Sequence, residues 1–286
     1  MGTSGWNYPR WRGDFYPKGL VHRLELAYMA QRLPTVEVNG TFYGLTRPSA
    51  CAAWRAAAPE DFVFAIKGSR FITHMLKLRK FETPLANFFA SGLLRLGSAL
   101  GPILWQLPPQ LPFDEERARA FFAAVPRDIA AAERWARRHD ARTTGRAALR
   151  AAGGATGPIR HAVEIRHASW LTDRALETLR ELDVALVAAD TAGKYPLSYE
   201  RTADFAYVRL HGSATLYASR YTDAEVTAWA RRIDAWTSAG SDVYVYFDND
   251  AQGHAPHDAV RLQAAVDALA PPAARGDSAI SVSAPP

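Results

Sequence analysis

Residues 161–170 read HAVEIRHASW, and this stretch decides how the rest of the chain is interpreted. Apolar Val163 and Ile165 alternate with Glu164 and Arg166, which is the period of a β-strand. The two charged side chains therefore lie side by side on one face. Burying such charges in an otherwise apolar strand is costly unless each one is matched. The stretch thus predicts a strand that ends in a functional site.

Strands and helices alternate along the rest of the chain. Thr172 and Asp173, for example, supply N-cap chemistry for a helix directly after the first stretch. The expected strands are 2–6, 36–39, 62–67, 103–107, 161–166, 184–189, 205–210 and 243–247. The expected helices are 24–33, 48–58, 85–100, 114–125, 173–182, 223–238 and 257–269. Repeated units of this size predict an α/β fold, a single-domain (β/α)8 TIM-like barrel over 1–270, with a doubly wound open sheet as the alternative.

Residues 127–160 form a basic insertion between the fourth helix and the fifth strand. They contain eight arginines against three acidic residues, which accounts for the whole formal net charge of +5. We expect a helix followed by a Gly- and Ala-rich loop, on the barrel face opposite the site, with the arginines on a solvated surface. The Pro-, Ala- and Ser-rich residues 271–286 are predicted to be a disordered C-terminal tail.

Composition excludes several classes of protein. The sequence contains no run of about 18 apolar residues, so we expect no membrane span. The N-terminus lacks the pattern of a signal peptide. Cys51 is the single cysteine, which excludes an internal disulfide and a cysteine-cluster metal site and favours a reducing, cytoplasmic location. No P-loop, dinucleotide fingerprint or nucleophile elbow is present.

Seven motifs spread over the chain carry a family resemblance. They are GTSGW at 2–6, NGTFYG at 39–44, ITH at 72–74, LGPILWQLPP at 100–109, EIRHASW at 164–170, RLHG at 209–212 and VYVYFDND at 243–250. On these motifs the chain resembles the YecE-like family, also called domain of unknown function 72. The resemblance implies a TIM-barrel fold and, as the family name records, no assigned activity.

In a TIM barrel the active site lies at the C-terminal ends of the strands, where this chain places polar residues late in nearly every strand. We expect Glu164 to be the general acid or base, with Asp190, His211 and Asp248 assisting proton transfer or binding a metal. The substrate-binding candidates are Glu37, Asn39, Tyr43, Lys67, His74, Gln106, Arg166, His167, Trp170 and Arg209. Lys67, Arg166 and Arg209 suit an anionic group.

The same residues also fit a purely structural interpretation, an interior network in which Lys67, Arg166 and Arg209 balance the carboxylates without catalysis. Aromatic residues of the predicted mouth suit stacking on a sugar or base, or packing as a cap. They are Trp6, Tyr8, Trp11, Phe15, Tyr16, Phe42, Tyr43 and Trp170.

The predicted function is a hydrolase or lyase acting on a phosphorylated or sugar-containing small molecule at the mouth of the barrel. A divalent metal is an open alternative, held by histidines with Glu164 or Asp190, although no HExxH motif is present. The non-catalytic alternatives are a metabolite-binding barrel and a nucleic-acid-binding barrel. The neutral charge balance outside 127–160 argues against nucleic acid.

Overall fold

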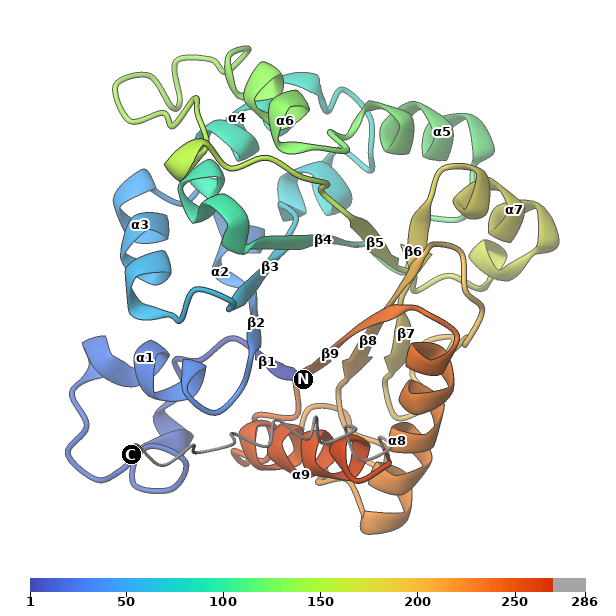
Figure 1. Cartoon of the computed structure of the whole chain (residues 1–286). Helices are drawn as coiled ribbons and strands as arrows, with labels where there is room; N and C mark the ends of the chain where they lie inside the picture. Colours follow the sequence, from blue (N-terminus) through green and yellow to red (C-terminus); the bar gives the residue numbers. More distant parts are fainter. Residues whose placement is uncertain (270–286) are drawn as a thin grey trace, which may run out of the picture.

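The computed structural model describes residues 1–269 and contains one parallel sheet rolled into a barrel (Figure 1). Its strand order is β6-β5-β4-β3-β2-β1-β9-β8-β7, and every pairing is parallel. The strands are β1 (Gly2–Ser4), β2 (Thr35–Val38), β3 (Val63–Lys67), β4 (Leu100–Gln106), β5 (His161–Glu164), β6 (Val184–Leu186), β7 (Ala188–Asp190), β8 (Phe205–Leu210) and β9 (Asp242–Phe247).

The two ends of this strand order are consecutive pieces of chain, since only Val187 separates β6 from β7. The first piece pairs with β5 and the second with β8, while the Val187 N–H donates to the carbonyl of Val163 at 2.9 Å. Tilted barrel strands are staggered, so the lower half of one strand meets one neighbour and its upper half the other. The strand expected over 184–189 is therefore present in two parts, and the predicted TIM-like barrel is confirmed.

Eight helices cover the outside of the ring within residues 1–269 (Figure 1). They are α1 (Glu25–Ala30), α3 (Pro48–Ala57), α4 (Glu82–Ala90), α5 (Glu115–Ala124), α6 (Ile129–Ala136), α7 (Asp173–Glu181), α8 (Asp223–Ser238) and α9 (Ala255–Asp267). The short α2 (Gly40–Tyr43) instead follows β2 at the C-terminal end of the barrel. The helix predicted over 223–238 has the observed bounds. The Asp114 side chain caps α5 by accepting from the Arg117 N–H. No helix within 1–269 has the length and apolar character needed to cross a membrane.

The helix expected over 85–100 is broken in the structure. It separates into α4 and a 3-10 segment, Leu93–Ala99, on either side of Gly92. Gly92 has φ 129°, and a Cβ there would lie 2.7 Å from the backbone nitrogen of Pro48. Only glycine fits this close approach. Residues 40–43 and 71–75, expected as loops, form a short helix and a single helical turn.

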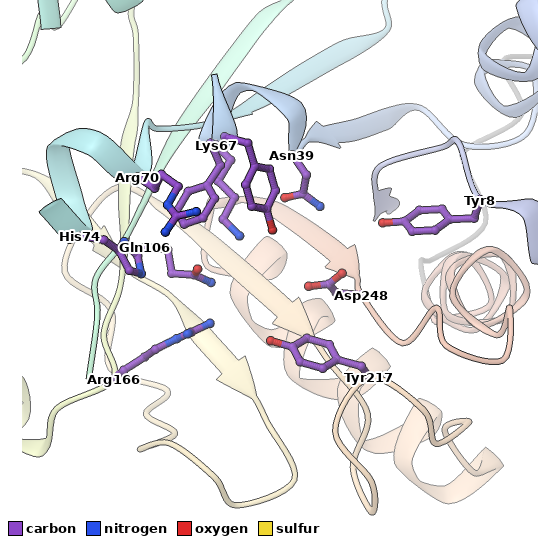
Figure 2. A pocket seen from close by; sticks show the side chains of 11 residues that line it. Tyr8, Asn39, Lys67, Arg70, His74, Gln106, Arg166, Tyr217 and Asp248 are labelled. Atoms are coloured by element: carbon purple, nitrogen blue, oxygen red, sulfur yellow. The ribbon is translucent and has the colours of Figure 1, made fainter. Parts of the chain in front are cut away.

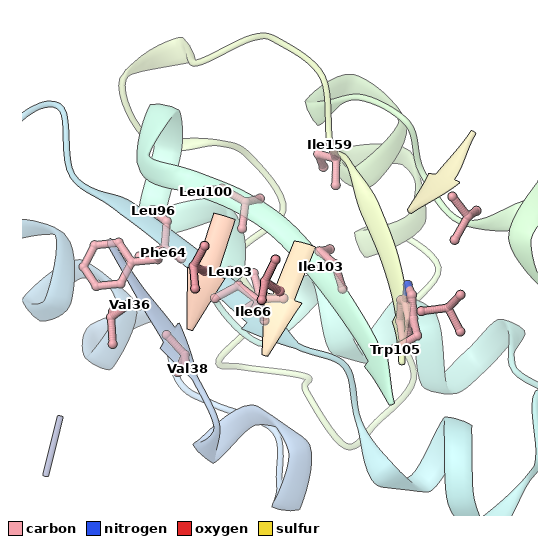
Figure 3. Packing of buried hydrophobic residues seen from close by; sticks show 14 of the residues in the cluster. Val36, Val38, Phe64, Ile66, Leu93, Leu96, Leu100, Ile103, Trp105 and Ile159 are labelled. Carbon is pink, nitrogen blue, oxygen red and sulfur yellow. The ribbon is translucent and has the colours of Figure 1, made fainter. Parts of the chain in front are cut away.

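The core lies between the outer faces of the strands and the helices. Val36, Phe64, Ile66, Ile103 and Trp105 are buried here, in one cluster with Leu93 and Leu96 of the 3-10 segment after α4 (Figure 3). The side chains on the other face of each strand point into the barrel interior, where alanines lie beside large aromatic residues. This interior cluster consists of Ala65, Leu104, Ala162, Ala185, Val187, Ala189, Phe205, Tyr207 and Tyr246.

The basic segment 127–160 supplies α6, which lies beside α4 on the outside of the ring (Figure 1). Asn87 of α4 donates to the Asp140 carboxylate at 3.0 Å, and the Ala148 N–H donates to the carbonyl of Ala90 at 2.8 Å. These bonds attach the segment to the barrel wall. The tail predicted over 271–286 lies outside the described residues.

Candidate functional site

Arg209, from β8, lies at the centre of the polar end of the barrel with none of its side chain exposed. Its guanidinium contacts carboxylates from three other parts of the sheet. Nη2 is 2.8 Å from Oε1 of Glu37 on β2 and 3.1 Å from Oδ2 of Asp248 after β9. Nη1 is 2.6 Å from Oε2 of Glu164 on β5. One arginine therefore connects four strands. The strand alternation predicted such an interior network of arginines and carboxylates, without its exact pairs.

Glu37 is held from several directions. The Tyr207 hydroxyl donates to its Oε2 at 2.7 Å, and the Ser4 hydroxyl donates to its Oε1. Nη2 of Arg209 also donates to the Ser4 hydroxyl oxygen at 2.8 Å. Glu37 is fully buried. Its carboxylate is thus matched by one guanidinium and two hydroxyls, which satisfies a charge that would otherwise be costly at this depth.

Glu164 lies beneath the pocket described below and does not form its wall. Its Oε1 accepts from Nε2 of Gln106 at 2.8 Å and from Nε of Arg166 at 3.3 Å, and only 1% of its side chain is exposed. Burial would raise the pKa of this carboxyl, but the charge of Arg209, with His211 Nε2 3.8 Å away, holds it well below its ordinary value. Glu164 is therefore a permanent carboxylate that orients its neighbours.

His211 and Asp248 form a pair at the edge of this network, with Nδ1 3.0 Å from Oδ2. Nη1 of Arg209 lies 3.2 Å from the other ring nitrogen. In the neutral imidazole that nitrogen accepts from the guanidinium, so Nδ1 carries the proton that faces Asp248. Burial opposes ionisation of Asp248, but the adjacent His211 ring and the charge of Arg209 lower its pKa. Asp248 keeps 18% of its side chain exposed.

A pocket of about 500 Å³ opens directly above the network (Figure 2). Its wall comes from segments that follow β1, β2, β3, β5, β8 and β9 and from the last residues of β3 and β4, so it occupies the C-terminal face of the barrel. It is lined by Tyr8, Asn39, Phe42, Tyr43, Lys67, Arg70, His74, Gln106, Arg166, Tyr217 and Asp248. Lys67, Gln106, Arg166 and Asp248 point toward a common centre in Figure 2.

The charges on this wall are unequal. Lys67, Arg70 and Arg166 are the basic groups, and Asp248 is the one carboxylate among the lining residues. His74 adds no charge at neutral pH, because burial and the nearby Arg166 lower its pKa to about 4. The pocket therefore presents an excess of positive charge, which favours an anionic ligand.

Comparison with known proteins identifies the family. The model of the family described as "Protein of unknown function DUF72" matches residues 1–278. The chain belongs to the DUF72 family. This confirms the YecE-like resemblance seen in the motifs. UPF0759 protein YecE of Escherichia coli (strain K12) is 28% identical over 142 residues, 43% of this chain and 50% of that protein. The match thus spans about half the length of the curated relatives.

Two solved structures share the barrel of this DUF72 chain. A DUF72 family protein from Thermotoga maritima has a TM-score of 0.72 at 22% identity, covering 93% of this chain and 98% of its own. A DUF72 family protein from Enterococcus faecalis has a TM-score of 0.70 at 18% identity, covering 93% and 94%. At these identities the similarity establishes the fold alone, and the chemistry has to be inferred from the residues of the site.

The structure gathers most of the predicted site residues in two layers. Asn39, Tyr43, Lys67, His74, Gln106, Arg166 and Asp248 line the pocket, whereas Glu37, Glu164, Arg209 and His211 form the network beneath it. The ion-pair network that was the structural alternative is thus present, and Lys67 and Asp190 form none of its ion pairs within the described residues.

Three predicted residues lie apart from the pocket. Asp190 accepts from the Tyr221 hydroxyl at 3.0 Å, and burial raises its pKa. His167 caps a short turn, where its Nδ1 accepts from the Ser169 N–H. Trp170 is 2% exposed, and its indole N–H donates to the carbonyl of Leu111 at 3.0 Å. The last two side chains serve local packing where substrate contact was expected.

Three positions of the candidate site were missed by sequence reasoning. Ser4 joins the network, and Arg70 and Tyr217 line the pocket. Tyr8 and Phe42 were noted only as members of the aromatic set. Only their position in the sequence could have identified these residues, since each one ends a strand or lies in the segment that follows one. Polarity alone could not separate them from other loop residues.

The metal alternative has no ready set of ligands in the described part of the chain. Residues 1–269 contain no group of three or more His, Cys, Asp or Glu side chains that could hold a metal ion. His257, one of the histidines considered for such a site, instead contacts Asp14 at 2.9 Å near the surface.

Proposed function

We propose that this DUF72 protein is an enzyme acting on a small phosphorylated or sugar phosphate substrate in the barrel-mouth pocket, by hydrolysis or lyase chemistry. The observation that carries the proposal is the excess of cations on the pocket wall, Lys67, Arg70 and Arg166 against Asp248. A cavity of about 500 Å³ suits a small metabolite. Tyr8, alongside the other aromatic lining residues, suits the sugar part of such a molecule.

Arg166 is the best placed of these groups to bind a phosphate. Its Nε donates to Glu164, which fixes the direction of the side chain. Its guanidinium carbon lies over the ring of Tyr195, 4.7 Å from the ring centroid. Nη1 and Nη2 form no hydrogen bond within residues 1–269. A guanidinium with its two terminal nitrogens available matches two phosphate oxygens. Glu164 then acts through Arg166 as a positioning residue, and the role of proton acceptor passes to another group.

Asp248 is that group in the proposal. It is the carboxylate that both faces the pocket and contacts His211. Its lowered pKa keeps it ionised at neutral pH, so it can accept a proton from water or from substrate. His211 and Arg209 would stabilise the carboxylate orientation from below.

The experiment has a binding part and a turnover part. Inorganic phosphate should raise the melting temperature of the full chain, and Arg166→Gln should weaken phosphate binding about tenfold, or ~1.4 kcal/mol. Arg134→Gln, in the basic insertion, is the matched control and should bind normally. A phosphatase and lyase screen with phosphorylated metabolites should yield turnover that Asp248→Asn abolishes while phosphate binding persists.

Two results would count against the proposal in different ways. If phosphate neither binds nor stabilises the protein, the anion pocket is wrong. If phosphorylated ligands bind but none is converted, the non-catalytic metabolite-binding alternative is favoured.

A further inference from the structure

Lys67 differs from every other lysine of the chain. The sequence has five lysines, and four of them, Lys18, Lys77, Lys80 and Lys194, are exposed. Lys67 is the last residue of β3 and is only 8% exposed. Its amine points into the pocket (Figure 2). The backbone around it is fixed, because the Thr41 hydroxyl donates to its carbonyl at 2.7 Å.

The amine of Lys67 has no hydrogen-bond or ion-pair partner among the described residues. No carboxylate lies within 4.0 Å of it and it donates no hydrogen bond, although Glu37, Glu164 and Asp248 are all nearby. Nζ lies over the ring of Phe42, 4.5 Å from the ring centroid. A buried cation that served only to neutralise carboxylates would be expected to touch one of them. Lys67 instead presents a free amine to the cavity.

The environment also makes the neutral amine available. Burial and the charge of Arg209 lower the pKa of Lys67 from its ordinary value of 10.5 to about 8, against the opposing carboxylates. About one tenth of the side chains are then unprotonated at pH 7, compared with roughly one in three thousand for an ordinary lysine. Arginine could not supply a neutral nucleophile at any accessible pH. The choice of lysine at this position therefore has a chemical consequence.

We propose that Lys67 is a nucleophile that forms a Schiff base with the carbonyl carbon of a phosphorylated aldehyde or ketone. The inference rests on the proposed function, since it assigns the phosphate to Arg70 and Arg166 and the carbonyl group to Lys67. It narrows the substrate class to carbonyl compounds and favours the lyase branch, because an iminium withdraws electrons from the adjacent bond.

The step balances without an oxidant or reductant. The Nζ lone pair attacks the carbonyl carbon, a C–N bond forms, and the carbonyl oxygen takes up the proton released by nitrogen, which gives a carbinolamine. The hydroxyl then takes a second proton from solvent, the C–O bond breaks as water leaves, and nitrogen donates its electron pair to form the C=N bond of a protonated iminium. Asp248 is placed on the same wall to receive a proton from the neighbouring carbon in a following step.

Reductive trapping tests the proposal. The full chain is incubated with dihydroxyacetone phosphate or glycolaldehyde phosphate and sodium borohydride, and adducts are located by intact-mass and peptide mass spectrometry. We expect one adduct per chain, on the peptide containing Lys67, with a yield that saturates with ligand and rises at least fivefold from pH 6 to pH 8. Excess inorganic phosphate should compete.

Two variants provide the controls. Lys67→Arg keeps the positive charge but should abolish the adduct, and Lys77→Arg, at an exposed lysine, should label as the unmodified chain does. If Lys67→Arg folds poorly, locating the adduct on the Lys67 peptide of the unmodified chain still tests the proposal. Labelling spread over the exposed lysines, or no adduct with either compound, would overturn the inference.

The same samples separate this inference from the proposed function. If inorganic phosphate stabilises the chain and Arg166→Gln removes the effect while no adduct forms, the role of Lys67 alone is wrong. If an adduct forms at Lys67 but phosphate neither binds nor competes, the nucleophile stands and the anion pocket is wrong.

Discussion

Nη1 of Arg209 lies 2.6 Å from Oε2 of Glu164, and neither side chain is accessible to solvent. The pair joins β8 to β5 across the barrel interior. Replacing a buried ion pair by apolar groups can be neutral, but removing one partner leaves an uncompensated charge. The network beneath the pocket is therefore sensitive to loss of the Arg209 guanidinium, which contacts three carboxylates.

Arg209→Met is expected to lower the free energy of unfolding by about 3–5 kcal/mol, because Glu37 and Glu164 would lose their shared partner. Urea unfolding measures the change. Arg180→Met removes an exposed ion pair with Glu200 and should cost less than about 1 kcal/mol. A loss for Arg209→Met no larger than that of the control would contradict the prediction.

Glu164→Gln separates a positioning role from a chemical one. If Glu164 orients Arg166, the variant should bind inorganic phosphate several-fold more weakly, with the pH profile of any turnover unchanged. A group that exchanged protons with substrate would show the opposite result, with turnover lost, phosphate affinity unchanged and one limb of the pH profile missing. Calorimetric titration with phosphate, together with steady-state kinetics, distinguishes the two.

His161 should make the protein sensitive to acid. Its Nδ1 accepts from the indole N–H of Trp105 at 3.0 Å, and its Nε2 lies 2.8 Å from the carbonyl of Pro126, so the buried ring is neutral. Burial and the charge of Arg127 lower its pKa to about 3, against the hydrogen bond to Pro126. The unfolded chain therefore binds one more proton than the native state between pH 3 and 6.5.

That difference means stability falls as the pH drops through this window, by up to about 1.4 kcal/mol per unit for this group. His161→Leu should be less stable at neutral pH, because Trp105 loses its acceptor, but its unfolding free energy should decline less steeply between pH 6 and 4. Parallel slopes for the two proteins in urea titrations would refute the assignment.

Asp250 should have the opposite dependence on pH. The indole N–H of Trp11 donates to its Oδ1 at 3.0 Å, while Oδ2 is buried without a partner among the described residues. Burial and the charge of Asp248 raise its pKa well above the ordinary value, so the native state keeps a proton that the unfolded chain releases above about pH 4.

Stability contributed by Asp250 is therefore lost as the pH rises from 4 toward its native pKa, by about 1.4 kcal/mol per unit. Asp250→Asn retains an acceptor for Trp11 and should gain stability relative to the unmodified chain at pH 8 but not at pH 4. Thermal unfolding at the two pH values checks this, and an equal effect at both would argue against it.

Most of the candidate site residues were predicted from strand periodicity. Glu37, Gln106, Glu164, Arg209 and Asp248 come late in their strands with the polar parity, and parallel strands around a barrel bring such positions to one end. The sequence could not predict which of these side chains are buried in the network and which line the pocket. Glu164 and Arg166 share one face, but the strand ends at Glu164, so the first is buried in the network and the second lines the pocket.

Contacts between distant segments explain the remaining errors. Trp170 is held by the carbonyl of Leu111, 59 residues away, and nothing in the local sequence distinguishes this packing from exposure at the mouth. Arg70 and Tyr217 enter the pocket through the paths of their loops, and loop geometry has no periodic signal in sequence. The break at Gly92 likewise depends on its close approach to Pro48.

The sharing of Arg209 between Glu37 and Glu164 also bears on the order in which the barrel assembles during synthesis. Glu37 emerges from the ribosome with the first quarter of the chain, whereas its guanidinium partner follows some 170 residues later. Until β8 docks, Glu37 lacks the guanidinium that matches its charge, so burying its carboxylate is costly. An amino-terminal half-barrel is therefore a poor folding unit, and the complete ring should form in one cooperative transition.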